Sequence, residues 1–188
     1  MSRRPPHIPQ RVPIFVGCEG ESEAAYIALL QALANDAGAH VHISIELLTP
    51  GAGDPLARVT RALAHLARLR GRRTAFAHAF VLMDSDQLAL DPVRGERARR
   101  DAEAGGLTLI WQEPCHEALL LRHLPGRADR RPGNTGDALQ ALRRDWPDYA
   151  KPMTRRELQR RLDLATVRQA GGAHPELARL LRAIGLLN

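Results

Sequence analysis

The chain is poor in cysteine and in long apolar runs, and each shortage excludes a class of protein. Cys18 and Cys115 are its two cysteines among 188 residues, and they lie far apart and outside any C-x-x-C spacing. We therefore expect neither a disulfide framework nor a zinc ribbon, and a reducing cytoplasm fits this usage. No apolar run approaches the roughly 18 residues that cross a bilayer, so no membrane contact is expected.

Lysine and aromatic residues are also scarce. Lys151 is the single lysine, and aromatic residues make up 4% of the chain, yet the formal net charge is +6. The basic charge is compatible with a nucleic-acid partner, and equally with an arginine-rich solvated surface that reflects a GC-rich coding bias. With few aromatic rings to stack on bases, any recognition of nucleic acid would depend on phosphate and shape.

Short apolar runs alternate with longer amphipathic ones, which is the pattern of a parallel sheet covered by helices. This predicts an α/β fold with a compact, four-stranded, mainly parallel sheet over residues 12–126. Strands are expected at 12–18, 40–48, 79–84 and 107–112, and the alternation in the second favours a sheet edge. Helices are expected from about Ser22, from the cap Asp54 with Pro55 behind it, and over 93–104.

The two ends of the chain read differently from this core. Residues 1–11 form a proline-rich segment that we expect to be a disordered arm. Beyond Pro114 the pattern is helical, and residues 127–188 are expected to form a small helical C-terminal extension. Within it, Thr154 and Glu157 predict a capping box at the start of one long helix over 154–170.

Acidic residues follow two of the predicted strands. Asp84 and Asp86 end the run FVLMDSD, and Glu19 and Glu23 belong to CEGESE after the first strand. In an open parallel sheet, ligands bind beyond the carboxyl ends of the strands, so Glu19 would approach both aspartates if strands one and three are neighbours. Crowded carboxylates need a cation, and Mg²⁺ or Mn²⁺ with oxygen ligands is the usual one. The alternatives are solvated turn aspartates and helix-start glutamates.

Four segments in one order resemble the RloB-like family of Toprim-domain proteins. They are FVGCEGESEAAYIALL, GAGDP, AFVLMDSDQ and EPCHEALLLRH, and the likeness covers about Ile14 to Lys151. The family carries E-G-x-x-(S/T)-E-x-x-Y, D-x-D and a P-C-F-E-L-W-L-L-L-H-type segment, and this chain has one residue fewer between Gly20 and Ser22 than the first pattern. His116 and Leu119 depart from this pattern, which has Phe and Trp there, and Glu113 stands where Asn is frequent.

The resemblance implies a metal site and its neighbours. It places metal-binding acids at Glu19, Asp84 and Asp86, with further matches at Glu23, Tyr26, Glu117 and His123. Glu19 would be a ligand or a general base, and Glu117 would extend the acidic site. His123 would orient it or contact phosphate, with a satisfied core histidine as the alternative. A zinc site of Cys115, His116 and His123 has no usual spacing, and Tyr26 falls on an apolar helix stripe, as a packed residue does.

Basic residues near the C-terminus are the candidates for contacting substrate. Lys151, in the segment DYAK, corresponds to a Tyr-x-x-Lys or similar segment of the family and can contact a scissile phosphate as a point charge, although one surviving lysine is also explained by chance. Ordinary solvated surface is the alternative for the arginines that could track a nucleic-acid backbone, which are Arg127, Arg130, Arg131, Arg155 and Arg156.

The function expected from these features is Mg²⁺-dependent hydrolysis of RNA or DNA phosphodiesters. Metal ions offset charge on the phosphate and activate water, so no covalent protein nucleophile is required. The family resemblance implies prokaryotic defence against phage, with abortive infection or a restriction-linked role, and an ATPase partner; a homodimer is compatible with the sequence. The rivals are a non-catalytic nucleic-acid or protein binding module on a Toprim fold and, less favoured, a D-x-D glycosyltransferase.

Overall fold

A computed structural model describes residues 10–49, 54–71, 75–88 and 90–188. Residues 1–9 of the expected N-terminal arm, and residues 50–53 of the loop before Pro55, lie outside the described residues. In the described part, a four-stranded sheet has the order β2-β1-β3-β4, and all three strand pairs are parallel. The strands are β1 (Val12–Cys18), β2 (Val41–Leu47), β3 (His78–Asp84) and β4 (Thr108–Gln112).

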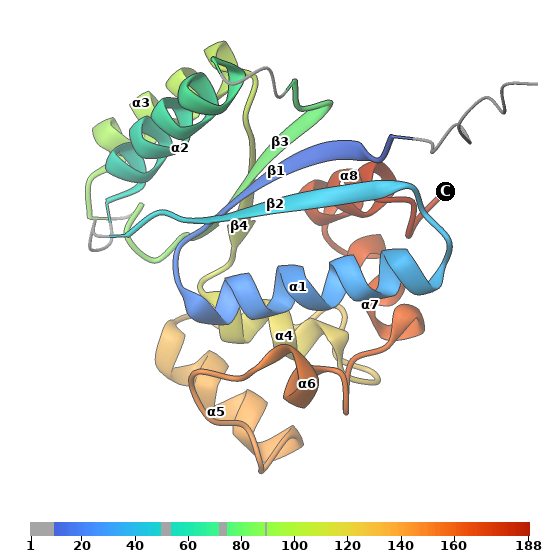
Figure 1. The fold of residues 1–188 in the computed structure, drawn as a ribbon. Coiled ribbons are helices and arrows are strands. Elements are labelled where there is room, and N and C mark those ends of the chain that lie inside the picture. Colours follow the sequence, from blue (N-terminus) through green and yellow to red (C-terminus); the bar gives the residue numbers. More distant parts are fainter. Residues whose placement is uncertain (1–9, 50–53, 72–74, 89) are drawn as a thin grey trace, which may run out of the picture.

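Helices cover both faces of the sheet (Figure 1). One face packs on α2 (Pro55–Arg70) and α3 (Pro92–Ala104), and the other packs on α1 (Glu21–Asp36), α4 (His116–His123), α7 (Leu164–Gly172) and α8 (Pro175–Ala183). The strands alternate between these layers, because Ile14 and Val16 join the core under α1 whereas Phe15 joins the core under α2. The predicted α/β fold with a parallel sheet is therefore confirmed, and β2 lies at a sheet edge as expected.

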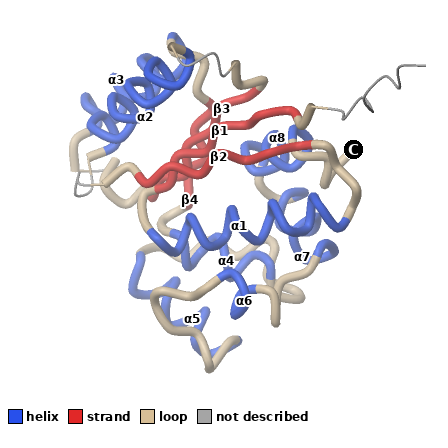
Figure 2. The backbone as a smooth tube through the Cα atoms, in the orientation of Figure 1, coloured by secondary structure: helices blue, strands red, loops and turns tan. Residues whose placement is uncertain are grey.

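The C-terminal helices share a core with the sheet. These helices also include α5 (Thr135–Asp145) and α6 (Arg155–Leu158), which lie furthest from the strands in Figure 2. Leu142 of α5, Leu158 of α6 and Leu180 of α8 are all buried in the same apolar cluster as Ile14 of β1. The helical C-terminal part is thus a layer added to the α/β core, and its burial ties it to the first strand.

The single long helix predicted over 154–170 is wrong. The chain leaves the helix after Leu158 and starts α7 at Leu164, where the Asp163 carboxylate accepts the backbone N–H of Thr166 at 2.9 Å. This second cap interrupts an amphipathic pattern that otherwise continues through both segments. The predicted caps at Asp54 and Thr154 are confirmed, since each side chain accepts a backbone N–H of its helix.

None of the described helices combines the length and the apolar character that crossing a bilayer would need.

Candidate functional site

The sheet order places two acidic residues at one point on its carboxyl edge. Glu19 directly follows β1, Asp84 is the last residue of β3, and β1 and β3 are neighbours. The chain runs from β1 to β2 on one side and from β3 to β4 on the other, and such a switch in strand order opens a crevice for ligands. The backbone N–H of Asp84 donates to Glu19 Oε2 at 3.1 Å, so the predicted approach of these two residues is confirmed.

A buried arginine holds the other oxygen of Glu19. The guanidinium of Arg58, in the first turns of α2, lies 2.5 Å from Glu19 Oε1 and also donates to the Glu19 carbonyl at 3.3 Å. Sequence reasoning missed Arg58. Its position offered a faint signal, because the start of a helix that follows a parallel strand faces the carboxyl edge of the sheet.

Asp84 is a carboxylate without a partner. Its Oδ1 is buried and accepts no hydrogen bond from any described residue. Burial is the main reason that the pKa of Asp84 rises to about 8, and the negative charges of Glu19, Glu23, Asp86 and Glu117 raise it further. A carboxyl group in this position gains from a proton or from a cation.

Asp86 lies in a turn beyond the strand. Because β3 ends at Asp84, strand alternation does not set the direction of the Asp86 side chain. The backbone N–H groups of Ser85 and Asp86 both donate to the Pro114 carbonyl, and Thr135 Oγ1, at the start of α5, donates to Asp86 Oδ2 at 3.5 Å. Asp86 is exposed, so it faces solvent beside the half-buried Asp84.

Two further acids predicted for the site are buried close by. Glu23 is 5% exposed, and its Oε2 accepts the backbone N–H of Gly20 at 3.0 Å. Glu117 is 1% exposed, and its Oε1 accepts the Tyr149 hydroxyl at 3.0 Å and forms an ion pair with Lys151. Glu117 Oε2 is buried with no partner among the described residues. The structure therefore gathers Glu19, Glu23, Asp84, Asp86 and Glu117 into one region of negative charge.

Lys151 supplies positive charge to this region. Burial lowers the pKa of its ammonium, but the hydrogen bond and charge of Glu117 outweigh burial, so the pKa is raised overall. Its side chain is 52% exposed, so about half of it is in contact with solvent. Lys151 thus lies where the acidic region meets water.

His123 lies in the core and not on the surface of the site. Its Nδ1 bonds to the Leu119 carbonyl at 2.8 Å and its Nε2 to the Tyr26 hydroxyl at 2.9 Å, and the ring is completely buried. Because burial disfavours the charged ring, the pKa of His123 falls to about 4. This geometry matches the satisfied core histidine, and it makes Tyr26 a packed residue as expected. Direct contact between His123 and a phosphate does not fit this burial.

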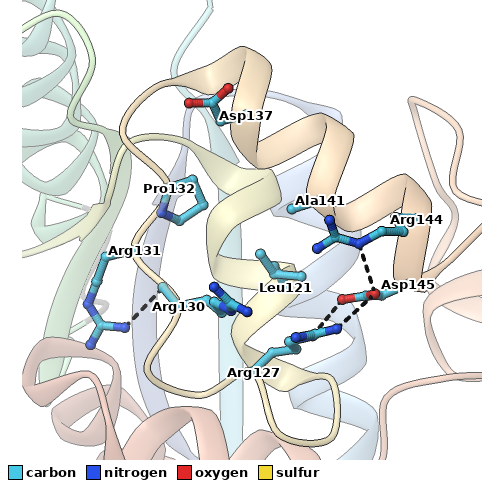
Figure 3. Close-up of a pocket in the computed structure, with 9 residues that line it drawn as sticks. All are labelled: Leu121, Arg127, Arg130, Arg131, Pro132, Asp137, Ala141, Arg144 and Asp145. Atoms are coloured by element: carbon cyan, nitrogen blue, oxygen red, sulfur yellow. Dashed lines mark hydrogen bonds and ion pairs between the residues drawn. The ribbon is translucent and has the colours of Figure 1, made fainter.

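The arginines predicted to bind nucleic acid fall into two places. Arg127, Arg130 and Arg131 line a pocket between α4 and α5 (Figure 3). Arg155 and Arg156 belong to α6 and do not line it, and Arg155 donates to Gln159 at 3.2 Å. The structure thus brings the first three together with each other but not with the last two.

The donor chemistry of the acidic region fits a hard divalent cation. Two buried carboxylate oxygens, Asp84 Oδ1 and Glu117 Oε2, have no partner among the described residues, and such oxygens are the ligands that Mg²⁺ and Mn²⁺ prefer. Within the described ranges, no three His, Cys, Asp or Glu side chains are arranged as a ready-made metal cage. Cys115, His116 and His123 form no such group, and both ring nitrogens of His123 already bond to Leu119 and Tyr26. Mg²⁺, however, is usually held by one or two carboxylates together with water and substrate phosphates.

Comparison with known proteins gave no relative. No protein-family model, no curated protein and no solved structure matches this chain.

Proposed function

We propose that the acidic region is the active site of a Mg²⁺- or Mn²⁺-dependent nuclease that hydrolyses phosphodiester bonds of RNA or DNA. The observation that carries this proposal is the partnerless Asp84 Oδ1, buried among four other carboxylates at the carboxyl edge of a parallel sheet. Holding so much like charge together costs free energy unless a cation compensates it. A cation bound there can stabilise the negative charge of a phosphate group during hydrolysis.

Asp84 and Asp86 would hold the ion, since one has a free buried oxygen and the other is exposed next to it. The bound ion would offset charge on the phosphate and lower the pKa of water. Glu19 is oriented by the Asp84 N–H and by Arg58, which suits it to complete the ligand set or to take a proton from water. Lys151 would contact a phosphate oxygen from the solvent side, and Glu117 would position Lys151.

The biological setting of the proposal follows from the resemblance to RloB-like Toprim proteins alone. It comprises a cytoplasmic enzyme that acts in prokaryotic defence against phage, with a separately encoded ATPase as partner. The order of acids after β1 and β3 supports this assignment, because the Toprim pattern has a Glu-Gly after one strand and Asp-x-Asp after a later one.

The test is cleavage of a panel of tRNA, single-stranded DNA and plasmid by the purified protein with Mg²⁺, Mn²⁺ or EDTA. Asp84→Asn and Glu19→Gln each replace a carboxyl group that can bind a cation with an amide of nearly the same shape, and Glu96→Gln on the exposed face of α3 is the matched control. We expect metal-dependent cutting that both site variants lose and the control keeps. Cutting that persists in EDTA, or in Asp84→Asn, contradicts the proposal.

A non-catalytic nucleic-acid binding module is the second candidate, and one observation favours it. Arg58 already neutralises Glu19 and Lys151 already neutralises Glu117, so two of the five acids have internal cations. In that case the protein binds no divalent ion by calorimetry, and EDTA leaves its affinity for nucleic acid unchanged. Metal binding that Asp84→Asn abolishes would exclude this candidate.

A further inference from the structure

A small arginine-lined pocket lies beside α5, separate from the acidic region. It has a volume of about 170 Å³ and is bounded by Leu121 of α4, by the loop after α4 and by one face of α5. Figure 3 shows its lining, whose charged residues are Arg127, Arg130, Arg131, Asp137, Arg144 and Asp145. The lining thus contains four arginines and two aspartates, and it has a formal surplus of positive charge.

The two aspartates do not neutralise the four arginines. Arg127 forms a two-point ion pair with Asp145, at 2.6 and 3.1 Å, and Arg144 approaches the same carboxylate at 3.5 Å. The guanidinium of Arg130 forms no ion pair or side-chain hydrogen bond with any described residue, and in Figure 3 it points into the middle of the lining. Arg130 therefore offers a complete set of donors, and Arg144 keeps its terminal N–H groups.

A buried arginine fixes the loop that carries Arg130. Arg122 is 1% exposed and donates to the Arg130 carbonyl at 3.1 Å and to the Glu113 carbonyl at 2.7 Å. It pairs with no carboxylate in the described part of the chain, and its burial, followed by the charge of Arg131, lowers its pKa. A guanidinium buried without a counter-ion adds to the positive potential here. Its bond to the Arg130 carbonyl fixes the backbone of the loop that carries Arg130.

We propose that this pocket binds one backbone phosphate of a nucleic acid, through Arg130 and Arg144. The inference rests on the proposed function for the class of ligand. Pockets that enclose whole small molecules have volumes of about 300–1,000 Å³, so 170 Å³ suits a single phosphate group of a chain that continues outside. The planar guanidinium presents paired N–H donors that match two phosphate oxygens, which favours phosphate over an isolated halide.

The position of α5 links the pocket to the acidic region. Thr135 at the first turn of α5 contacts Asp86, whereas Arg144 and Asp145 stand in its last turn. From Thr135 to Arg144 this helix rises by about 14 Å, which corresponds to roughly four steps of 3.4 Å along one strand of a duplex. A strand whose scissile phosphate lies at Asp86 can therefore place a phosphate a few nucleotides away in the pocket.

A second hollow shares Arg127 and Asp145 with this pocket but is less suited to an anion. It is also lined by Arg161, which donates to the Asp145 carbonyl at 2.9 Å and lies over the Trp146 ring at 5.8 Å. Its arginines thus already have partners, so we assign the phosphate to the pocket with Arg130.

The test is binding of a labelled single-stranded oligonucleotide in EDTA, which separates binding from metal-dependent hydrolysis. Arg130→Ala/Arg144→Ala is compared with Arg97→Ala/Arg100→Ala, which removes the same charge from exposed positions of α3. We expect the pocket variant to bind about tenfold more weakly at low salt. Its slope of log K against log salt should be less steep by about 0.7, the value for one phosphate contact on a single strand. The control variant should keep the wild-type slope, and circular dichroism should show that both variants are folded.

Equal affinity and slope for the pocket variant and the wild type would overturn the inference. A calorimetric titration with inorganic pyrophosphate distinguishes the source of the anion. Pyrophosphate binding that the pocket variant loses, with oligonucleotide affinity unchanged, also overturns it, because the pocket then takes a free anion. If the protein does not cleave nucleic acid but the pocket variant binds it more weakly, the inference holds and the proposed activity does not. If the protein cleaves nucleic acid and the pocket variant binds it as tightly as the wild type, the proposed activity holds and the inference does not.

Discussion

The backbone N–H of Asp84 donates to the carboxylate of Glu19 at 3.1 Å, across 65 residues of sequence. This bond joins the ends of β1 and β3, and it fixes one Glu19 oxygen next to Asp84, whose Oδ1 has no partner in the described part of the chain. The amide of a glutamine can accept the same bond, whereas alanine cannot. Glu19→Gln therefore removes the charge and keeps the join between the strands, which makes it the more informative substitution.

Divalent cations should stabilise the protein through Asp84. A ligand that binds only the folded state at one hundred times its Kd adds about 2.7 kcal/mol to the free energy of unfolding. For a chain of this length that corresponds to a rise in Tm of roughly 5–10 °C. We expect this rise with Mn²⁺ in thermal unfolding of the wild type and of Glu96→Gln. Asp84→Asn should lose it, and a full rise in that variant would disprove the role of Asp84 as a ligand.

The stability of the metal-free protein should fall between about pH 4 and pH 8 because of Asp84. Its folded-state pKa of about 8 is above its ordinary value of 3.8, so the folded state keeps a proton that the unfolded chain releases. The stabilising effect of that proton is complete below pH 3.8 and is lost as the pH rises to 8, at up to about 1.4 kcal/mol per pH unit.

Asp84→Asn isolates this effect, since an amide does not titrate. Chemical unfolding in EDTA at pH 5 and pH 8 should show that the variant gains stability relative to the wild type as the pH rises. A constant difference at the two pH values would contradict the raised pKa of Asp84.

Local patterns in the sequence predicted the sheet and the first part of the site. The apolar runs that end at Cys18 and Asp84 specify strands because burial on both faces demands continuous apolar residues. Once the strands are parallel and adjacent, the residues at their carboxyl ends must meet. The contact between Glu19 and Asp84 therefore follows from the sequence once β1 and β3 are known to pair.

Features that depend on tertiary contact were not predictable in the same way. Arg58 lies 39 residues from Glu19, and only its place at the start of α2 indicates that its guanidinium could reach the end of β1. The break before Leu164 has a local signal in the Asp163 and Thr166 cap, but the continuous amphipathic pattern obscured it. The sequence predicts that Lys151 contacts a phosphate, but it gives no sign of the long-range ion pair that Lys151 forms with the buried Glu117.

Removing the Tyr26 hydroxyl should reduce stability without touching the acidic site. Tyr26→Phe leaves His123 Nε2 buried and unpaired, which costs about 1–3 kcal/mol. Urea unfolding at pH 7.5 measures this cost, and any metal-dependent activity should be retained in the folded variant. Loss of activity at unchanged stability would mean that the pair belongs to the active site and not to the core.

The ion pair of Lys151 and Glu117 should stabilise the protein at neutral pH and less in acid. Burial acts to raise the pKa of Glu117, but Lys151 outweighs it, so the pKa lies below 4.5 and the stabilisation is lost as the pH falls through that lowered value. Lys151→Met should cost about 1–2 kcal/mol at pH 7, less than a fully buried pair because Lys151 is half exposed. The difference should shrink as the pH falls below 4.5, and Lys151→Arg should restore the stability at pH 7.

Arg58 should compete with a divalent ion for the charge of Glu19. Arg58→Met leaves the Glu19 carboxylate partly buried without its cation, which should destabilise the metal-free protein by about 3 kcal/mol. Adding Glu19→Gln removes the uncompensated charge, so the double variant should be more stable than the sum of the single changes, by about 1–3 kcal/mol. Arg58→Met also makes the acidic region more negative, so the variant should bind Mn²⁺ several-fold more tightly than the wild type does in calorimetry.

Arg68→Ala, on the exposed face of the same helix, should change neither the stability nor the affinity for Mn²⁺. Tighter Mn²⁺ binding together with lower metal-free stability would show that Arg58 and the cation share one carboxylate, whereas additive stabilities would place Glu19 and Arg58 outside any common interaction.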